Sequence, residues 1–431
     1  MNCPISEKLR HQRILILGFG KEGQSTLRFL HEHLQIKPAA IADQNPVSPA
    51  LLNQIPTDIQ IHTGENYLSF VQDYDLTIKA PGIPLRLIPN QFHYKITSQT
   101  NLFLSKYAHQ TIGITGTKGK STTSSLIHFL LLESGRDSIL AGNIGIPAFD
   151  IIPLIREDSV VVYEMSANQL EMAAYSPHIA ILLNIYEEHL DHFGSFEAYC
   201  QAKLKIVAMQ NPHDFAIVHP DWIGACAHSV STIQALELSF IPSVNENPLL
   251  GDHNLININA AFMALAAAGI STGKLKHLLP GFKPLPHRLE HCGRADEVIF
   301  INDSIATIPE ACLSAIQAVG KVDFLLLGGF DRGIQYDKLA KVISDLHIPH
   351  ILFTGEAGKR IAGMIPKELP GQKLLQYKSM QQAFEYIAQH SIPGDVCLLS
   401  PAAASYDQYR NFEHRGDVFK ENVASFKRKT P

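Results

Sequence analysis

The sequence lacks several features that mark large classes of proteins. Its six cysteines are scattered, at positions 3, 200, 226, 292, 312 and 397, and no two form a Cys-x-x-Cys pair, so neither a zinc ribbon nor a disulfide framework is indicated. No apolar run approaches the roughly 20 residues that cross a bilayer. The first twelve residues are polar and lack an apolar signal core. These features predict a reduced, cytoplasmic protein without a membrane partner.

A strong charge of either sign is also missing. The formal net charge is -5, and the basic run Lys427 to Lys429 stands at the end of the chain, so no nucleic-acid partner is expected. What is present is an ordinary globular composition, with 45% hydrophobic and 18% charged residues. A chain of 431 residues exceeds the usual size of one core. We therefore expect two or three domains.

The most informative stretch runs from Gly113 to Thr122, with the sequence Gly-Ile-Thr-Gly-Thr-Lys-Gly-Lys-Ser-Thr. A short strand, a glycine-rich turn and the start of a helix are predicted, and such a turn aims backbone N–H groups at a phosphate. Lys120 adds a positive charge for the outer phosphates, and Ser121 offers a hydroxyl for Mg²⁺. Position 114, where the common phosphate loop has its first glycine, is isoleucine. We predict an ATP site here.

A second glycine motif lies near the beginning of the chain. The apolar segment 13–18 leads into Gly18-Phe-Gly-Lys-Glu-Gly23, a helical pattern follows, and the strand 39–42 ends at Asp43. This arrangement is typical of a dinucleotide-binding unit. It predicts NAD binding when taken alone, but a UDP group satisfies the same geometry. The Pro81-Gly82 turn is expected at the same edge of the sheet.

Polar residues follow the strands of the middle part. Glu164 ends the strand 159–163, where a Mg²⁺ ligand commonly stands. The apolar run 179–183 reads as a buried parallel strand, and the predicted strand 179–185 opens into Tyr-Glu-Glu-His189-Leu-Asp-His. With Glu164, one of these histidines suits Mg²⁺ or Mn²⁺ better than zinc. The stretch 251–257 is expected to start an alanine-rich helix over 258–268, and Asn254 and Asn257, three residues apart, share one face at its N-terminal end.

The remaining chain continues the alternation of strand and helix. A linker is expected over 92–109, and the prolines at 280, 284 and 286 mark a boundary to a last domain. Strands are predicted at 298–301, 324–329, 351–354 and 396–400, with a helix at 309–319. The pattern predicts an α/β fold with mostly parallel sheets.

The whole chain resembles the Mur ligases, and within them the MurD type. The motifs stand in the family's order: the phosphate loop, Gly142-Asn-Ile-Gly145, Glu164-Met-Ser-Ala-Asn-Gln-Leu-Glu171, Asn184-Ile-Tyr-Glu-Glu-His189, His253-Asn254, His287-Arg288, Asn302-Asp-Ser304 and Leu399-Ser-Pro-Ala-Ala-Ala-Ser405. The resemblance implies three domains. They are an N-terminal Rossmann-like UDP-binding domain (1–98), a central P-loop ATPase-like domain (99–284) and a C-terminal Rossmann-like glutamate-binding domain (285–431).

The resemblance implies an ATP-dependent acid–D-amino-acid ligase of peptidoglycan precursor synthesis. ATP would phosphorylate the carboxylate of UDP-N-acetylmuramoyl-L-alanine, and glutamate would attack the acyl phosphate. The implied catalytic residues are Lys120, Glu164, His189 and Lys203. Two Mg²⁺ ions, for which Mn²⁺ could substitute, would be connected with Ser121, Glu164, His189 and Lys203. The resemblance makes Lys203 a carbamate formed with CO₂, because an ammonium group could not hold a metal ion.

The same resemblance assigns the binding residues. For ATP they are Gly116, Thr117, Lys118, Gly119, Lys120, Ser121, Thr122, Asn254, Asn257, Arg288 and Asp303. For the UDP substrate they are Phe19, Lys21, Asp43, Gln44, Gly82 and Asn143. For glutamate they are Thr307, Arg332, Ser405 and Phe412. A monomer whose domains close over a linker near Pro284 is expected.

Two departures from the family pattern concern the amino acid. Isoleucine stands at 305, where the family usually has lysine, and Arg332 stands where many members have lysine. Arg332 can bind a carboxylate through two parallel hydrogen bonds. D-glutamate is favoured, with the L-glutamate branch of the family as the alternative. Two hypotheses outside this activity are an NAD(P)-dependent dehydrogenase, which would leave 113–122 unexplained, and a non-catalytic nucleotide-binding protein on the same scaffold.

Overall fold

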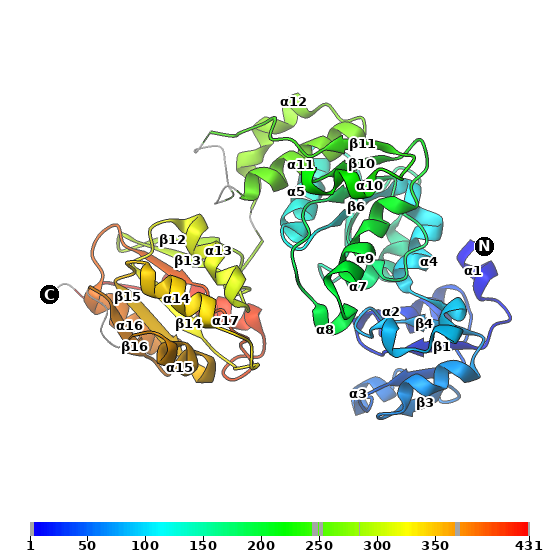
Figure 1. Ribbon diagram of the computed structural model, residues 1–431, viewed down its shortest axis with the longest axis horizontal. Helices are drawn as coiled ribbons and strands as arrows, with labels where there is room; N and C mark the ends of the chain where they lie inside the picture. Colours follow the sequence, from blue (N-terminus) through cyan, green and yellow to red (C-terminus); the bar gives the residue numbers. More distant parts are fainter. Residues whose placement is uncertain (1–3, 244–248, 250–252, 284, 367–370, 430–431) are drawn as a thin grey trace. The chain divides into compact units, whose positions relative to one another are not determined.

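The structure is a computed structural model that describes residues 4–243, 249, 253–283, 285–366 and 371–429. Within these ranges the strands form three sheets, each of which falls inside one of the three predicted domains (Figure 1). The predicted α/β class with parallel sheets is confirmed. The exact domain boundaries at 98 and 284 stay a prediction. By its contacts the chain divides into two units, the first comprising 1–246 with 253–282 and the second 247–252 with 283–431.

The first sheet is parallel throughout and has β1 at its centre. In spatial order its strands are β3 (Gln60–Thr63), β2 (Ala40–Asp43), β1 (Ile14–Leu17), β4 (Leu76–Lys79) and β5 (Ile96–Thr97). Its helices include α1 (Pro4–Leu9), α2 (Lys21–Arg28), the π-helical turn η1 (Phe29–His33) and α3 (Pro49–Leu52). All four residues of β1 are buried, as the apolar run 14–17 predicts for a central parallel strand.

The second sheet is also parallel and carries the phosphate loop at the end of β6. Its order is β11 (Thr232–Ala235), β10 (Phe215–Val218), β9 (Ile179–Leu182), β6 (Thr111–Thr115), β8 (Val160–Glu164) and β7 (Ser138–Gly142). The surrounding helices are α4 (Gln99–Tyr107), α5 (Lys120–Glu133), α6 (Ala148–Ile151), α7 (Ala167–Leu170), α8 (Leu190–Phe193), α9 (Phe196–Ala208), α10 (Ile223–Cys226), α11 (His253–Ala267) and α12 (Thr272–Leu275).

The expected linker over 92–109 is wrong. This stretch holds β5 and the helix α4, whose N-terminus is capped by the Ser98 hydroxyl. Three consecutive residues of α4, Leu102 to Leu104, are buried. They belong to a hydrophobic cluster that continues from the first sheet into the second. Ser98 caps a helix whose apolar side chains join the first two sheets into one unit.

The third sheet is mixed. β12 (Glu290–Ala295) is antiparallel to β13 (Val298–Asn302), and the sheet continues in parallel with β17 (Val396–Leu399), β14 (Phe324–Gly328), β15 (His350–Thr354) and β16 (Lys373–Gln376). One hydrophobic cluster joins one face to α13 (Pro309–Val319), α14 (Asp337–Asp345) and α15 (Gly355–Met364). Another joins the opposite face to α16 (Met380–His390) and α17 (Phe412–Ala424). Among the described residues, no helix is long and apolar enough to cross a membrane.

Candidate functional site

The turn between β6 and α5 is shaped by three glycines that have different physical roles. A Cβ on Gly113 would lie 2.5 Å from Pro177, and one on Gly116 would lie 2.9 Å from the Cβ of Leu183. Gly119, immediately before α5, has a φ of +88°, and a Cβ there would lie 2.2 Å from the Asn257 side chain. Close packing therefore explains the first two glycines, and close packing together with the left-handed backbone conformation explains the third.

Residues that follow the neighbouring strand β9 in the chain hold this loop. The backbone N–H of Thr117 donates to the Asn184 carbonyl at 2.9 Å, and the N–H of Lys118 donates to the Asn184 side chain at 2.8 Å. The Thr117 hydroxyl contacts the Tyr199 hydroxyl at 3.1 Å. Sequence reasoning gave Asn184 no role, although a polar residue directly after the apolar run 179–183 was a usable signal.

Two lysines converge on the carbonyl of Gly116. Lys120 Nζ donates to it at 2.9 Å and Lys203 Nζ, from α9, at 2.8 Å. Lys203 is 1% exposed, which is unusual for a lysine on a helix. Burial, together with the charge of Lys120, holds the pKa of Lys203 well below its ordinary value. The structure thus brings two of the predicted catalytic residues together in the phosphate loop.

His189 belongs to the same neighbourhood. It stands immediately before α8 with a φ of +57°, and its side chain lies 3.8 Å from a carboxylate oxygen of Glu188. Burial lowers the pKa of His189; the Glu188 charge opposes this shift, and the charges of Lys203 and Lys120 add to it. Glu188 in turn pairs with Lys118 at 3.1 Å. The segment that follows His189 forms one helical turn, α8.

Glu164 lies at the end of β8 and is 1% exposed. Its carboxylate accepts hydrogen bonds from the Asn143 amide at 2.8 Å and from the Ser124 hydroxyl at 3.5 Å. Ser124 lies one turn along α5 from Ser121, so Glu164 faces the helix that carries the predicted metal-binding hydroxyl. In the part of the chain that the structure describes, no group of three His, Cys, Asp or Glu side chains could hold a metal ion.

The predicted pair of asparagines on α11 lies against this loop. The Asn257 amide donates to the Asn254 side chain at 2.7 Å, which confirms that the two share one face. Asn257 also accepts a hydrogen bond from the Thr123 hydroxyl at 3.2 Å. A segment more than 130 residues away is thereby fastened to the beginning of α5.

In the first sheet, the predicted substrate residues lie at the carboxyl ends of β1, β2 and β4. Asp43 accepts hydrogen bonds from the N–H groups of Phe19, at 2.7 Å, and Asn45, at 2.8 Å. A Cβ on Gly20 or Gly82 would meet no heavy atom within 4 Å, whereas Gly23 packs against Gly18. The open glycines leave room for a ligand to approach the backbone at this edge.

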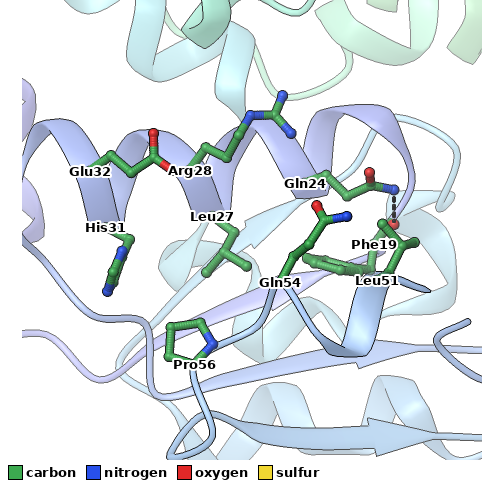
Figure 2. A pocket seen from close by; sticks show the side chains of 9 residues that line it. All are labelled: Phe19, Gln24, Leu27, Arg28, His31, Glu32, Leu51, Gln54 and Pro56. Atoms are coloured by element: carbon green, nitrogen blue, oxygen red, sulfur yellow. Dashed lines mark hydrogen bonds between the residues drawn. The ribbon is translucent and has the colours of Figure 1, made fainter. Parts of the chain in front are cut away.

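Figure 2 shows a cavity beside this edge, between α2 and the segment around α3. Its walls include Phe19, Gln24, Leu51 and Gln54, and the Gln24 amide donates to the Phe19 carbonyl at 3.1 Å. The volume is about 40 Å³, room for water molecules but not for a nucleoside. The Phe19 side chain is only 7% exposed. Its predicted contact with uridine stays a prediction.

A buried ion pair joins the first two sheets, and sequence reasoning missed it. Lys79, at the end of β4 and 1% exposed, donates to the Ile83 carbonyl at 2.6 Å and pairs with Glu171 at 3.1 Å. Glu171 also accepts from the N–H of Leu85 and lies 3.5 Å from His192. Burial alone would raise the pKa of Glu171, but the interactions with His192 and Lys79 outweigh it and lower the pKa.

The second unit holds the remaining predicted residues. Arg288 has a buried Nε atom without a hydrogen-bond partner among the described residues. Burial raises the pKa of Asp303 to about 7, against hydrogen bonds from Ser400 and the N–H of Leu289. Arg332 is exposed and donates to the Thr307 carbonyl at 2.7 Å. Ser405 is buried, in the loop that follows β17.

The fold and the loop between β6 and α5 define a protein of the phosphate-loop class, built from α/β sheets. Two family models match: the Mur ligase MurD-like N-terminal domain over residues 12–92 and the Mur ligase middle domain over residues 114–228.

Curated relatives match over nearly the whole chain. The UDP-N-acetylmuramoylalanine–D-glutamate ligase of Geobacillus kaustophilus is 33% identical, over 97% of this chain and 98% of the relative. The protein of that name from Clostridioides difficile is 31% identical, over 97% and 100%. The chain therefore belongs to the Mur ligase family.

Solved structures agree in fold. A MurF ligase from Thermotoga maritima, in complex with ADP, superposes with a TM-score of 0.60 at 16% identity, over 97% of both chains. The UDP-N-acetylmuramate–alanine ligase MurC of the same organism also gives 0.60, at 17% identity, over 96% of this chain and 100% of that one.

Proposed function

We propose that this chain joins the carboxylate of UDP-N-acetylmuramoyl-L-alanine to the amine of D-glutamate with consumption of ATP, as an acid–D-amino-acid ligase. The relatives at 31–33% identity that carry this activity in their names support it. The observation that carries the proposal is the pair of lysines, Lys120 and Lys203, at the Gly116 carbonyl of the phosphate loop.

The reaction brings together two anions, the carboxylate of the substrate and the γ-phosphate of ATP, so negative charge accumulates between them. The carboxylate attacks the γ-phosphorus of ATP, ADP leaves, and an acyl phosphate forms. The amine of glutamate attacks the acyl carbon, the C–O bond to phosphate breaks, and a proton is released with phosphate. Lys120 would neutralise the transferring phosphate, whose charge is the largest electrostatic demand of such a reaction. The ADP in the solved MurF structure supports ATP as the phosphoryl donor.

The donor set near the loop suits Mg²⁺, and Mn²⁺ as a substitute. Mg²⁺ binds through one or two carboxylates together with phosphates and waters, so the buried carboxylate of Glu164, the Ser121 hydroxyl and His189 would hold two such ions with ATP. The ions would screen the phosphate charges. Lys203 suits carbamate formation, because its lowered pKa favours the neutral amine, which adds CO₂ with loss of one proton.

The substrate contacts belong to the same proposal. Asn254, Asn257, Arg288 and Asp303 join the loop residues in binding ATP, and the buried Arg288 Nε, which has no partner among the described residues, is the supporting observation in the second unit. The edge of the first sheet around Gly20 and Gly82 binds the UDP group. The segment that contains Arg332 binds the side-chain carboxylate of glutamate. We also propose a cytoplasmic monomer.

The test is product formation with three substrates and matched omissions. Purified protein with Mg²⁺ and bicarbonate should release ADP and phosphate only when UDP-N-acetylmuramoyl-L-alanine and glutamate are both present. D-glutamate should support turnover and L-glutamate should not. Turnover with L-glutamate alone would assign the chain to the L-glutamate branch, which the isoleucine at 305 leaves open. Absence of turnover with either would refute the proposal.

A further inference from the structure

Arg415, on α17, is a buried cation whose hydrogen-bond partners are all neutral. It is 2% exposed. Its Nε donates to the Ser304 hydroxyl at 3.0 Å, and its two Nη atoms donate to the carbonyls of Ser304, Ala403 and Ala404 at 2.9, 3.0 and 3.3 Å. Among the described residues, no carboxylate forms an ion pair with it. Burial lowers the pKa of Arg415 to about 10, and electrostatic interactions with Tyr377, Tyr409 and Asp407 oppose this shift.

These bonds join the loops that leave two different strands, and one of these loops is bonded in turn to the loop after a third strand. Ser304 follows β13, and Ala403 and Ala404 follow β17. The Ala404 carbonyl also accepts the N–H of Phe330 at 2.8 Å, in the turn after β14. A Cβ on Gly329 would lie 2.2 Å from that carbonyl and 3.2 Å from Nη1 of Arg415. The turn after β14 therefore passes directly against the guanidinium group.

The proposed glutamate-binding residues lie on these same loops. Thr307 follows Ser304, Ser405 follows Ala404, and Arg332 lies in the turn after β14 and donates to the Thr307 carbonyl. The Ser304 hydroxyl, which accepts from Arg415, donates to the Phe412 carbonyl at 2.8 Å. One guanidinium group is thus hydrogen-bonded, directly or through one residue, to every segment of the proposed amino-acid site.

Stability alone does not account for a charge at this position. A buried ion without a counter-charge is costly, and an apolar side chain of similar volume is often neutral or stabilising in its place. An apolar side chain could not orient three loops, because dispersion contacts have no direction, whereas the planar guanidinium group offers donors in a rigid fork. The hydrogen bonds of Arg415 therefore suit a role in orienting these loops.

We infer that Arg415 is a positioning residue for the amino-acid substrate: it orients the loops that carry Thr307, Arg332 and Ser405 without touching the substrate itself. The inference rests on the proposed function and deepens it. It predicts that binding of glutamate depends on the fork of Arg415, whereas binding of ATP and of the UDP substrate does not.

The first test compares Arg415→Lys, which keeps the charge and loses the fork, with Phe419→Leu. Phe419 lies one turn further along α17, is fully buried, and packs against Phe300 and Phe384. Arg415→Lys should raise the KM for D-glutamate about tenfold or more, with the KM values for ATP and UDP-N-acetylmuramoyl-L-alanine within about threefold of wild type. Phe419→Leu should lower thermal stability and leave all three KM values unchanged.

A second variant keeps the inference testable if Arg415 variants fold poorly. Ser304→Ala removes the oxygen that links Arg415 to the Phe412 carbonyl. It should also raise the KM for glutamate, and in the double variant with Arg415→Lys the two effects should be less than additive, because they break one network. Additive effects, an unchanged KM for glutamate, or an equal rise in all three KM values would overturn the inference.

Hydrogen exchange separates this inference from the proposed function. In Arg415→Lys, amide exchange should accelerate in 303–307, 328–333 and 401–405 together, and it should not in Phe419→Leu. If wild-type protein shows no turnover, the proposed function and the glutamate assignment fail, and the exchange pattern still decides whether Arg415 orients the loops. Unchanged exchange in Arg415→Lys would overturn the positioning role even in an active enzyme.

Discussion

Replacing Gly119 with alanine tests the geometry of the phosphate loop most directly. Gly119 has a φ of +88° and stands immediately before α5. A left-handed conformation costs an L-residue about 1–2 kcal/mol. The added Cβ would also lie 2.2 Å from the Asn257 side chain. Asn257 would have to move, which would break its hydrogen bonds to Thr123 and Asn254.

The expected magnitude follows from these terms. Two hydrogen bonds at about 1 kcal/mol each, added to the backbone term, give about 3–4 kcal/mol against the present loop conformation. If only this conformation binds ATP, the apparent affinity falls by the fraction of molecules that retain it. At about 1.4 kcal/mol for each factor of ten, Gly119→Ala should weaken ATP binding by two to three orders of magnitude. Isothermal titration calorimetry with ATP and Mg²⁺ measures this change.

Gly135 provides a matched control at the other end of the same helix. It has a φ of +78°, and its added Cβ would meet no heavy atom within 4 Å. Gly135→Ala therefore carries the backbone term alone, about 1–2 kcal/mol, and should lower thermal stability without changing ATP affinity. If Gly119→Ala bound ATP within about threefold of wild type, the reasoning about the loop and Asn257 would be refuted.

Three further predictions concern other parts of the molecule. Lys203→Ala should abolish turnover and be partly rescued by a small carboxylic acid such as acetate; wild-type activity in this variant would show the carbamate assignment to be mistaken. Arg332→Ala should raise the KM for D-glutamate about tenfold to a hundredfold, the worth of hydrogen bonds to a charged group, and steady-state kinetics with an unchanged KM would remove Arg332 from the site. Glu171→Gln leaves the buried Lys79 ammonium without its counter-charge and should cost about 3 kcal/mol of stability in the first unit. Because the folded pKa of Glu171 is lowered, its contribution should be present above an ordinary glutamate pKa of about 4.3 and disappear as the pH falls below it. Thermal melts of wild type and variant should converge in that acidic range, and a constant difference would contradict the role of the ion pair.

The sequence by itself determined the class of the fold and the family. Apolar runs that are followed by glycine or a polar residue, such as 14–17 and 179–183, carry parallel strands, because a strand buried on both faces must be apolar along its length. The glycines, lysine and serine of 113–122 indicated the phosphate loop from local chemistry alone. The local sequence pattern over 92–109 did not predict the helix α4, because this helix is stabilised by burial against the first two sheets rather than by a strong hydrophobic periodicity of its own.

Only the tertiary structure decided which polar residues meet. Lys203 reads as a solvated helix residue, yet it is buried against Gly116, 87 positions away in the sequence. Asn257 contacts the beginning of α5, directly after the phosphate loop, because α11 packs beside α5. Lys79 and Glu171 form a pair across two sheets, and Arg415 donates to Ser304, 111 positions away in the sequence. Such contacts depend on which strand ends lie side by side, and strand order is a property of the assembled sheet.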